Sequence, residues 1–154
     1  MRRKIVAGNW KMNNNQSESN ILIHSIIEKN SENSSCNIYV SPSFPFLKDA
    51  VLTCSKSNIK VLSQNVSHLT DGALTGDVSC TMLKSIGINS VIIGHSERRT
   101  IFGESNEVLL KKIKRMFEEY RVPDKYCGRQ RGKFMWINGQ KIELPDNDPG
   151  GEHE

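Results

Sequence analysis

Four apolar runs alternate with four helix-like segments along residues 4–120, and this alternation constrains the fold more than any other feature of the sequence. The runs expected to form strands cover residues 4–10, 37–42, 59–64 and 90–95, and the segments expected to form helices cover 16–29, 45–54, 78–86 and 105–120. Parallel strands need a crossover connection, which is usually a helix, so this order predicts an α/β fold of parallel (β/α) units. The uninterrupted run Val91-Ile92-Ile93 is typical of a strand that is buried on both faces.

Polar residues follow each expected strand and are candidates for a functional site. They are Asn9 to Lys11, Ser41 to Phe44, Gln64-Asn65 and His95 to Arg98. In parallel α/β folds the carboxyl ends of the strands carry the function. We therefore expect these four segments to gather on one rim.

Lys11 and His95 are the rim residues with the clearest chemistry. A lysine ammonium at a strand end offers a positive charge to an anion such as a phosphate or an enediolate oxygen. A histidine at a helix N-terminus stays neutral more readily, and a neutral ring can donate a hydrogen bond to a carbonyl. Glu97 is a candidate charge partner for Lys11. Taken alone, Lys11 has the simpler interpretation of a surface lysine, and His95 that of a capping histidine.

The cysteines and histidines favour neither a metal site nor a disulfide framework. Cys36, Cys54, Cys80 and Cys127 contain no C-x-x-C pair, and no two of the four histidines stand at metal-ligand spacing. Small buried thiols are the simpler interpretation of the cysteines.

Charge and hydropathy argue against other classes of protein. No apolar run approaches the ~20 residues that span a bilayer, and the apolar stretch after the basic N-terminus is too short for a signal peptide. We therefore expect a cytoplasmic protein with no membrane partner. The net charge is +4, and the one dense basic cluster, Arg129 to Lys133, is better explained as a solvated loop than as a nucleic-acid contact.

The alternating pattern changes near residues 112–121. Residues 118–154 contain no further (β/α) unit and are interpreted as a tail. Within it, residues 133–144 are expected to form a hairpin around Asn138-Gly139, a type I′ turn signal. The expected organisation is therefore a region of about four βα units at 1–117, followed by the tail.

Several segments, taken together, are similar to one enzyme family. They are AGNWKMN at 7–13, Gln64-Asn65, GALTGD at 72–77, IGHSERR at 93–99 and FGE at 102–104. In order and spacing they closely resemble triosephosphate isomerase over residues 3–117. The resemblance implies a dimeric TIM barrel, here incomplete. It also implies an enzyme that interconverts dihydroxyacetone phosphate and D-glyceraldehyde 3-phosphate through an enediolate, without a cofactor.

The resemblance also implies roles for individual residues. Asn9 and Lys11 match the substrate-binding pair, in which Lys11 supplies electrostatic stabilisation. His95 matches the electrophile that polarises the substrate carbonyl, and Glu97 matches the glutamate that supports it. Thr75 matches the loop tip that enters the neighbouring subunit of a homodimer.

The catalytic glutamate base and the phosphate-binding loops of the family have no match in this chain. Two hypotheses follow from the resemblance. In the first, the chain is a triose-phosphate isomerase with very low activity as a lone polypeptide, since a positioned base contributes on the order of 10²–10⁴-fold. In the second, it is an inactive half-barrel that only binds triose phosphates or a complementary chain.

Overall fold

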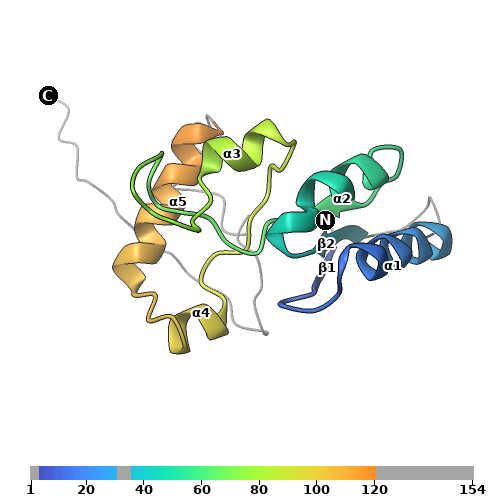
Figure 1. Cartoon of the computed structure of the whole chain (residues 1–154), viewed down its shortest axis with the longest axis horizontal. Helices are drawn as coiled ribbons and strands as arrows, with labels where there is room; N and C mark the ends of the chain where they lie inside the picture. The colour runs from blue at the N-terminus through green and yellow to red at the C-terminus, as the bar shows by residue number, and fades with distance from the viewer. Residues whose placement is uncertain (1–3, 31–35, 121–154) are drawn as a thin grey trace, which may run out of the picture.

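The computed structural model describes residues 4–30 and 36–120 (Figure 1). In chain order its elements are β1 (Lys4–Asn9), α1 (Gln16–Lys29), β2 (Cys36–Ser41), the 3-10 helix η1 (Phe44–Phe46), α2 (Leu47–Cys54), β3 (Lys60–Val61), α3 (Cys80–Ser85), α4 (Ser96–Thr100) and α5 (Asn106–Glu119). This order confirms the expected α/β class. In Figure 1, α1 and α2 lie with β1 and β2, whereas α3, α4 and α5 are grouped on the other side of the view.

The strands of the described residues form one parallel sheet in the order β1-β2-β3. β1 pairs with β2 along its whole length and ends with Asn9 opposite Ser41. β3 is short and pairs with β2 through Val61 opposite Val40. This register brings the carboxyl ends of neighbouring strands to the same edge of the sheet, where the polar segments begin.

The fourth expected strand, residues 90–95, forms a single parallel bridge to Ser63 instead of a strand. The Ser63 N–H donates to the Ser90 carbonyl at 3.0 Å, and the Ile92 N–H donates to the Ser63 carbonyl at 2.8 Å. Gly94 then has a φ of 73°, which is incompatible with an extended strand, and the chain turns into α4. The described residues therefore contain three strands and one bridge, not about four complete βα units.

α4 is not among the helices expected from apolar periodicity, because its five residues show none, although His95 was expected to lie at a helix N-terminus. α5 ends at Glu119, close to the expected end of this helix at residue 120. The rest of the expected tail, with the hairpin at 133–144 and the basic cluster from Arg129, lies outside the described residues.

Side-chain caps fix where α1, α3 and α5 begin. Asn15 accepts a hydrogen bond from the Glu18 N–H, and Glu18 accepts one from the Asn15 N–H, which together form a capping box at α1. Ser79 and Ser105 cap α3 and α5 through their hydroxyl oxygens. Each such cap contributes about 1 kcal/mol to stability.

The apolar core contains buried side chains from Trp10 to Leu109. Its fully buried side chains include Ile23, Val40, Leu47, Leu83 and Ile88. The thiols of Cys54 and Cys80 are buried as well, as the sequence predicts for small apolar thiols. Burial raises the pKa of Cys54 to about 11, so this thiol stays protonated at neutral pH and is a poor nucleophile.

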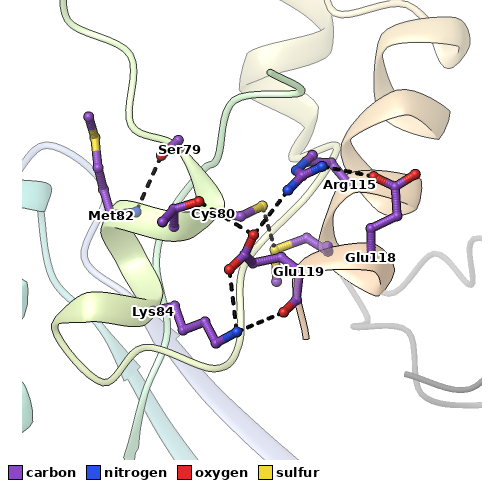
Figure 2. A network of polar contacts seen from close by, with 9 residues as sticks. Ser79, Cys80, Met82, Lys84, Arg115, Glu118 and Glu119 are labelled. Atoms are coloured by element: carbon purple, nitrogen blue, oxygen red, sulfur yellow. Dashed lines mark hydrogen bonds and ion pairs between the residues drawn. The ribbon is translucent and has the colours of Figure 1, made fainter. Parts of the chain in front are cut away.

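A polar network joins α3 to α5 (Figure 2). The Arg115 guanidinium donates to Glu119 Oε2 at 3.0 Å, and the Lys84 ammonium donates to the Glu119 carbonyl at 2.8 Å. Cys80 Sγ lies 3.3 Å from Met116 Sδ in the same contact. The Arg115 bond lies within α5, whereas the Lys84 bond and the Cys80 contact hold the end of α5 against α3.

A buried lysine anchors the middle of α5. The Lys112 side chain is 5% exposed and donates to Glu104 Oε1 at 2.6 Å and to Asn65 Oδ1 at 2.7 Å. Arg98 Nε donates to the same Glu104 oxygen at 2.5 Å. Burial raises the pKa of Glu104, but the hydrogen bonds and charges of Lys112 and Arg98 outweigh burial and hold this pKa below its usual value. The cluster ties α5 to α4 and to the segment after β3.

Replacing Lys112 with methionine is expected to lower the free energy of unfolding by about 3 kcal/mol, because it leaves a buried carboxylate with an incomplete set of partners. Urea unfolding followed by circular dichroism measures this change. Lys111→Met is the matched control, because Lys111 is exposed on the same helix. It should change stability by less than about 0.5 kcal/mol. Equal effects of the two variants would contradict the anchoring role of Lys112.

The contribution of Glu104 is expected to depend on pH. Its pKa is lower in the folded chain than in the unfolded chain, where it is about 4.3. A carboxylate of this kind contributes stability above its unfolded pKa and loses it as the pH falls through its folded pKa. The difference in free energy of unfolding between the wild type and Glu104→Gln should therefore be greatest near neutral pH and shrink below about pH 4. A difference that does not change with pH would contradict this assignment.

Candidate active site

The first part of the site lies at the end of β1. The Trp10 N–H donates to the Ser41 carbonyl at 3.1 Å, which extends the pairing with β2 by one more residue. Trp10 is buried in the core, so the residues on either side of it are fixed to the sheet. Asn9 Oδ1 accepts a hydrogen bond from the Lys11 N–H at 2.9 Å. The sequence Asn9-Trp10-Lys11 therefore turns the chain sharply at the rim.

Lys11 has an unusual backbone conformation. Its φ is 53°, and the only other non-glycine residue with a positive φ in the described residues is Asn14. Asparagine tolerates this left-handed region, whereas a lysine there costs roughly 1–2 kcal/mol. The surrounding contacts must therefore hold Lys11 in place, and an outlier of this kind is a frequent mark of a functional site.

The Lys11 ammonium lies 2.5 Å from Glu97 Oε1, which is the ion pair expected from the sequence. Both side chains are partly open to solvent, at 50% and 41% exposure. The hydrogen bond from Lys11 lowers the pKa of Glu97, so this carboxylate is ionised at neutral pH. An exposed ion pair of this kind contributes little to stability. Its consequence is geometric, because it links the end of β1 to the start of α4.

His95 is buried and occupies the N-cap position of α4, as the sequence predicts. Its Nδ1 accepts a hydrogen bond from the Glu97 N–H at 3.2 Å. The same nitrogen lies 3.5 Å from Glu97 Oε2, but an atom that accepts an N–H carries no proton, so the backbone bond decides the tautomer. In this geometry Nδ1 is the accepting nitrogen, which leaves Nε2 as the ring nitrogen that can donate a hydrogen bond.

Lys11, Glu97 and His95 therefore form one constellation built from two distant parts of the chain. Lys11 and His95 both contact Glu97, because the Lys11 ammonium lies on its carboxylate and His95 Nδ1 accepts its backbone N–H. Such a pair can stabilise negative charge that develops on a carbonyl oxygen. Glu97 is a poor candidate for a general base, because its lowered pKa makes it weakly basic.

Thr75 is the one predicted site residue that the structure does not bring to this constellation. It is exposed in the loop between Gly72 and Gly76, both of which have positive φ, and within the described residues it makes no hydrogen bond. Leu69, which precedes this loop, and Leu74 within it are 41% and 40% exposed. The loop thus presents apolar and polar side chains outward.

Other contacts around the site are not expected from the sequence. Gln64 is placed on the rim by its position after a strand, but nothing in the sequence shows that its amide contacts Lys11. The burial of Lys112 is likewise unexpected, because its helix is rich in exposed charges. The described residues contain no group of three or more metal-ligating side chains and no helix long and apolar enough to cross a membrane.

Comparison with known proteins connects this geometry to one family. The family model described as triosephosphate isomerase matches residues 4–123. The chain is 49% identical over 113 residues to the triosephosphate isomerase of Flavobacterium psychrophilum, covering 73% of this chain and 45% of that protein. It is 40% identical over 128 residues to the enzyme of the same name from Clostridium beijerinckii, covering 83% of this chain and 51% of that protein.

A third relative, the triosephosphate isomerase of Pelodictyon phaeoclathratiforme, is 42% identical over 120 residues, which are 77% of this chain and 48% of that protein. The chain thus spans about half the length of the curated relatives it matches. The match includes all of β1 to α5, and with it Lys11, His95 and Glu97. By the family model that covers most of its length and by the resemblance of its motifs, the chain belongs to the triosephosphate isomerase family.

Proposed function

We propose that this chain contributes to a triose-phosphate isomerase site, which interconverts dihydroxyacetone phosphate and D-glyceraldehyde 3-phosphate by proton transfer through an enediolate. The observation that carries the proposal is the constellation of Lys11, Glu97 and His95 at the carboxyl edge of the sheet. Family membership supports the choice of substrate, because the curated relatives bear the name of this activity.

Each residue of the constellation has a proposed role. His95 donates the Nε2 proton to the substrate carbonyl and polarises it, while the Lys11 ammonium stabilises the negative charge of the enediolate and of the phosphate. Glu97 orients both groups through its contacts with Lys11 Nζ and His95 Nδ1. Asn9 assists in substrate binding and also holds the Lys11 backbone. No cofactor is needed for this chemistry.

Proton removal needs a base that this constellation does not contain. Among the described residues, Glu97 is the one carboxylate within ion-pair distance of Lys11 or His95, and it is a weak base. The polarising half of the reaction is therefore assigned to this chain, and no residue of this chain is assigned the role of the base.

The second candidate function is a half-barrel that binds triose phosphates or a complementary chain without isomerising the substrate. The observation that favours it is β1, which has one hydrogen-bonded neighbour in the described sheet. Ile5 and Val6 on this strand are 51% and 56% exposed. An open strand with apolar side chains is a surface on which another strand can pair.

The proposal also includes a homodimer and a cytoplasmic location. A homodimer would place the loop of Thr75 against the neighbouring subunit, and the exposed Leu74 in this loop supports this assignment. A cytoplasmic location would suit an enzyme of sugar phosphates.

Replacing Lys11 with methionine is expected to weaken the binding of dihydroxyacetone phosphate at least about tenfold, because a charge-assisted hydrogen bond is worth roughly 1.5–3 kcal/mol. Isothermal titration calorimetry measures the dissociation constant. Lys48→Met is the control, since Lys48 is an exposed lysine on α2. Equal affinities of the two variants would contradict the role of Lys11 in substrate binding.

The 154-residue chain, assayed alone, is expected to bind dihydroxyacetone phosphate but to isomerise it at least about 100-fold more slowly than the Flavobacterium psychrophilum relative, because a general base contributes on the order of 10²–10⁴-fold. A coupled assay for glyceraldehyde 3-phosphate measures the rate. Turnover close to that of the relative would show that this chain has its own base and would rule out the second candidate function.

A further inference from the structure

The contacts of Gln64 point to a residue that controls where Lys11 directs its charge. Gln64 follows β3 and is partly buried, next to the fully buried Ser63. Its side-chain amide donates to the Lys11 carbonyl at 2.8 Å and to the Ser41 carbonyl at 2.9 Å. One amide group therefore joins the ends of β1, β2 and β3.

The Lys11 carbonyl has a second donor. The Ser43 hydroxyl, which follows β2, donates to it at 3.0 Å. The Lys11 N–H is bound by Asn9 Oδ1. Both backbone polar groups of Lys11 are thus held by side chains from three strand ends. Without such bonds, a lysine would relax from the left-handed region to an extended or helical conformation.

The backbone conformation of Lys11 sets the direction of its side chain. The lysine stem is flexible and half exposed, so its own packing does little to fix the ammonium. The direction of the Cα–Cβ bond changes with φ, and the present φ of 53° is the one at which the ammonium meets Glu97. A bond that stabilises this φ therefore acts on the charge at the other end of the side chain.

We infer that Gln64 is a positioning residue for Lys11, holding its backbone in the left-handed conformation that aims the ammonium at Glu97 and, under the proposed function, at the substrate. Gln64 acts through Lys11 and does not itself touch the substrate. Its side-chain type is required, because an amide provides two N–H donors in the orientation that two carbonyls need, whereas a carboxylate provides none.

The test uses Gln64→Met in the full chain, which removes both donors and keeps the length of the side chain. The first readout is the pKa of Glu97, which is measured by carboxyl ¹³C NMR of the folded protein. Because the hydrogen bond from Lys11 holds this pKa low, we expect it to rise towards its usual value in the variant. A residue that contributed only to overall stability would not change it.

The second readout is the dissociation constant of dihydroxyacetone phosphate, which should increase about tenfold in Gln64→Met. The matched control is Gln16→Met, which removes an exposed amide that donates to Asp49 at 2.8 Å on another part of the surface. Both the pKa of Glu97 and the dissociation constant should stay at their wild-type values in the control.

A folded Gln64→Met variant with the wild-type pKa at Glu97 would overturn the inference. If this variant does not fold, Ser43→Ala decides, because it removes the other donor to the Lys11 carbonyl. A smaller rise in the pKa of Glu97 would then support the inference, and an unchanged pKa would overturn it. The inference rests on the proposed function only in its second readout. If the wild type does not bind triose phosphate, the proposed function fails while the pKa of Glu97 still tests the positioning.

Discussion

The contact between Lys11 and Glu97 is the interaction on which the candidate site depends. It joins the turn after β1 to the first turn of α4, two segments that are distant in sequence. The parallel sheet makes this contact possible, because its register sets Asn9 level with Ser41 and the Ser63 bridge continues the sheet to residues 90–92. Polar side chains that follow these strands therefore meet at one edge, as expected for parallel α/β folds.

The site is built from features that stability alone would not select. Lys11 has a left-handed backbone conformation, which is unfavourable for a residue with a Cβ atom. His95 and Lys112 are both buried although their side chains are polar. Each has specific compensation. The Lys11 backbone is held by neighbouring side chains, His95 Nδ1 accepts the Glu97 N–H, and Lys112 donates to Glu104. Buried polar groups of this kind are tolerated only when their hydrogen bonds are satisfied, and here those bonds also fix the geometry.

Much of the fold could be predicted from the sequence because the signals are local. Apolar periodicity identified α1 and α5, and the continuous apolar runs identified β1 and β2. The prediction of a fourth strand was wrong because the pairing of residues 90–95 is limited to one bridge, and because the positive φ at Gly94 ends the extended chain. Neither property is encoded in the hydrophobic pattern that favoured a strand.

The site shows the same division between local and non-local information. The pairing of Lys11 with Glu97 was predicted from their opposite charges. The position of His95 at the start of a helix was predicted from its place at the end of an expected strand. The positive φ of Lys11 and the contact of Gln64 with its carbonyl did not, because both depend on how three strand ends are placed in space. Lys112 was also missed, since a lysine in a charged helix normally faces solvent.

The central claim is that Lys11 and His95 act on the same carbonyl group. The most direct test is ¹³C NMR of dihydroxyacetone phosphate labelled at its carbonyl carbon and bound to the wild-type chain, to Lys11→Met and to His95→Gln. Polarisation of the carbonyl should move its resonance downfield in the wild-type complex, and each substitution should reduce this change at saturating ligand. A bound ligand whose carbonyl resonance is the same in all three complexes would contradict the claim.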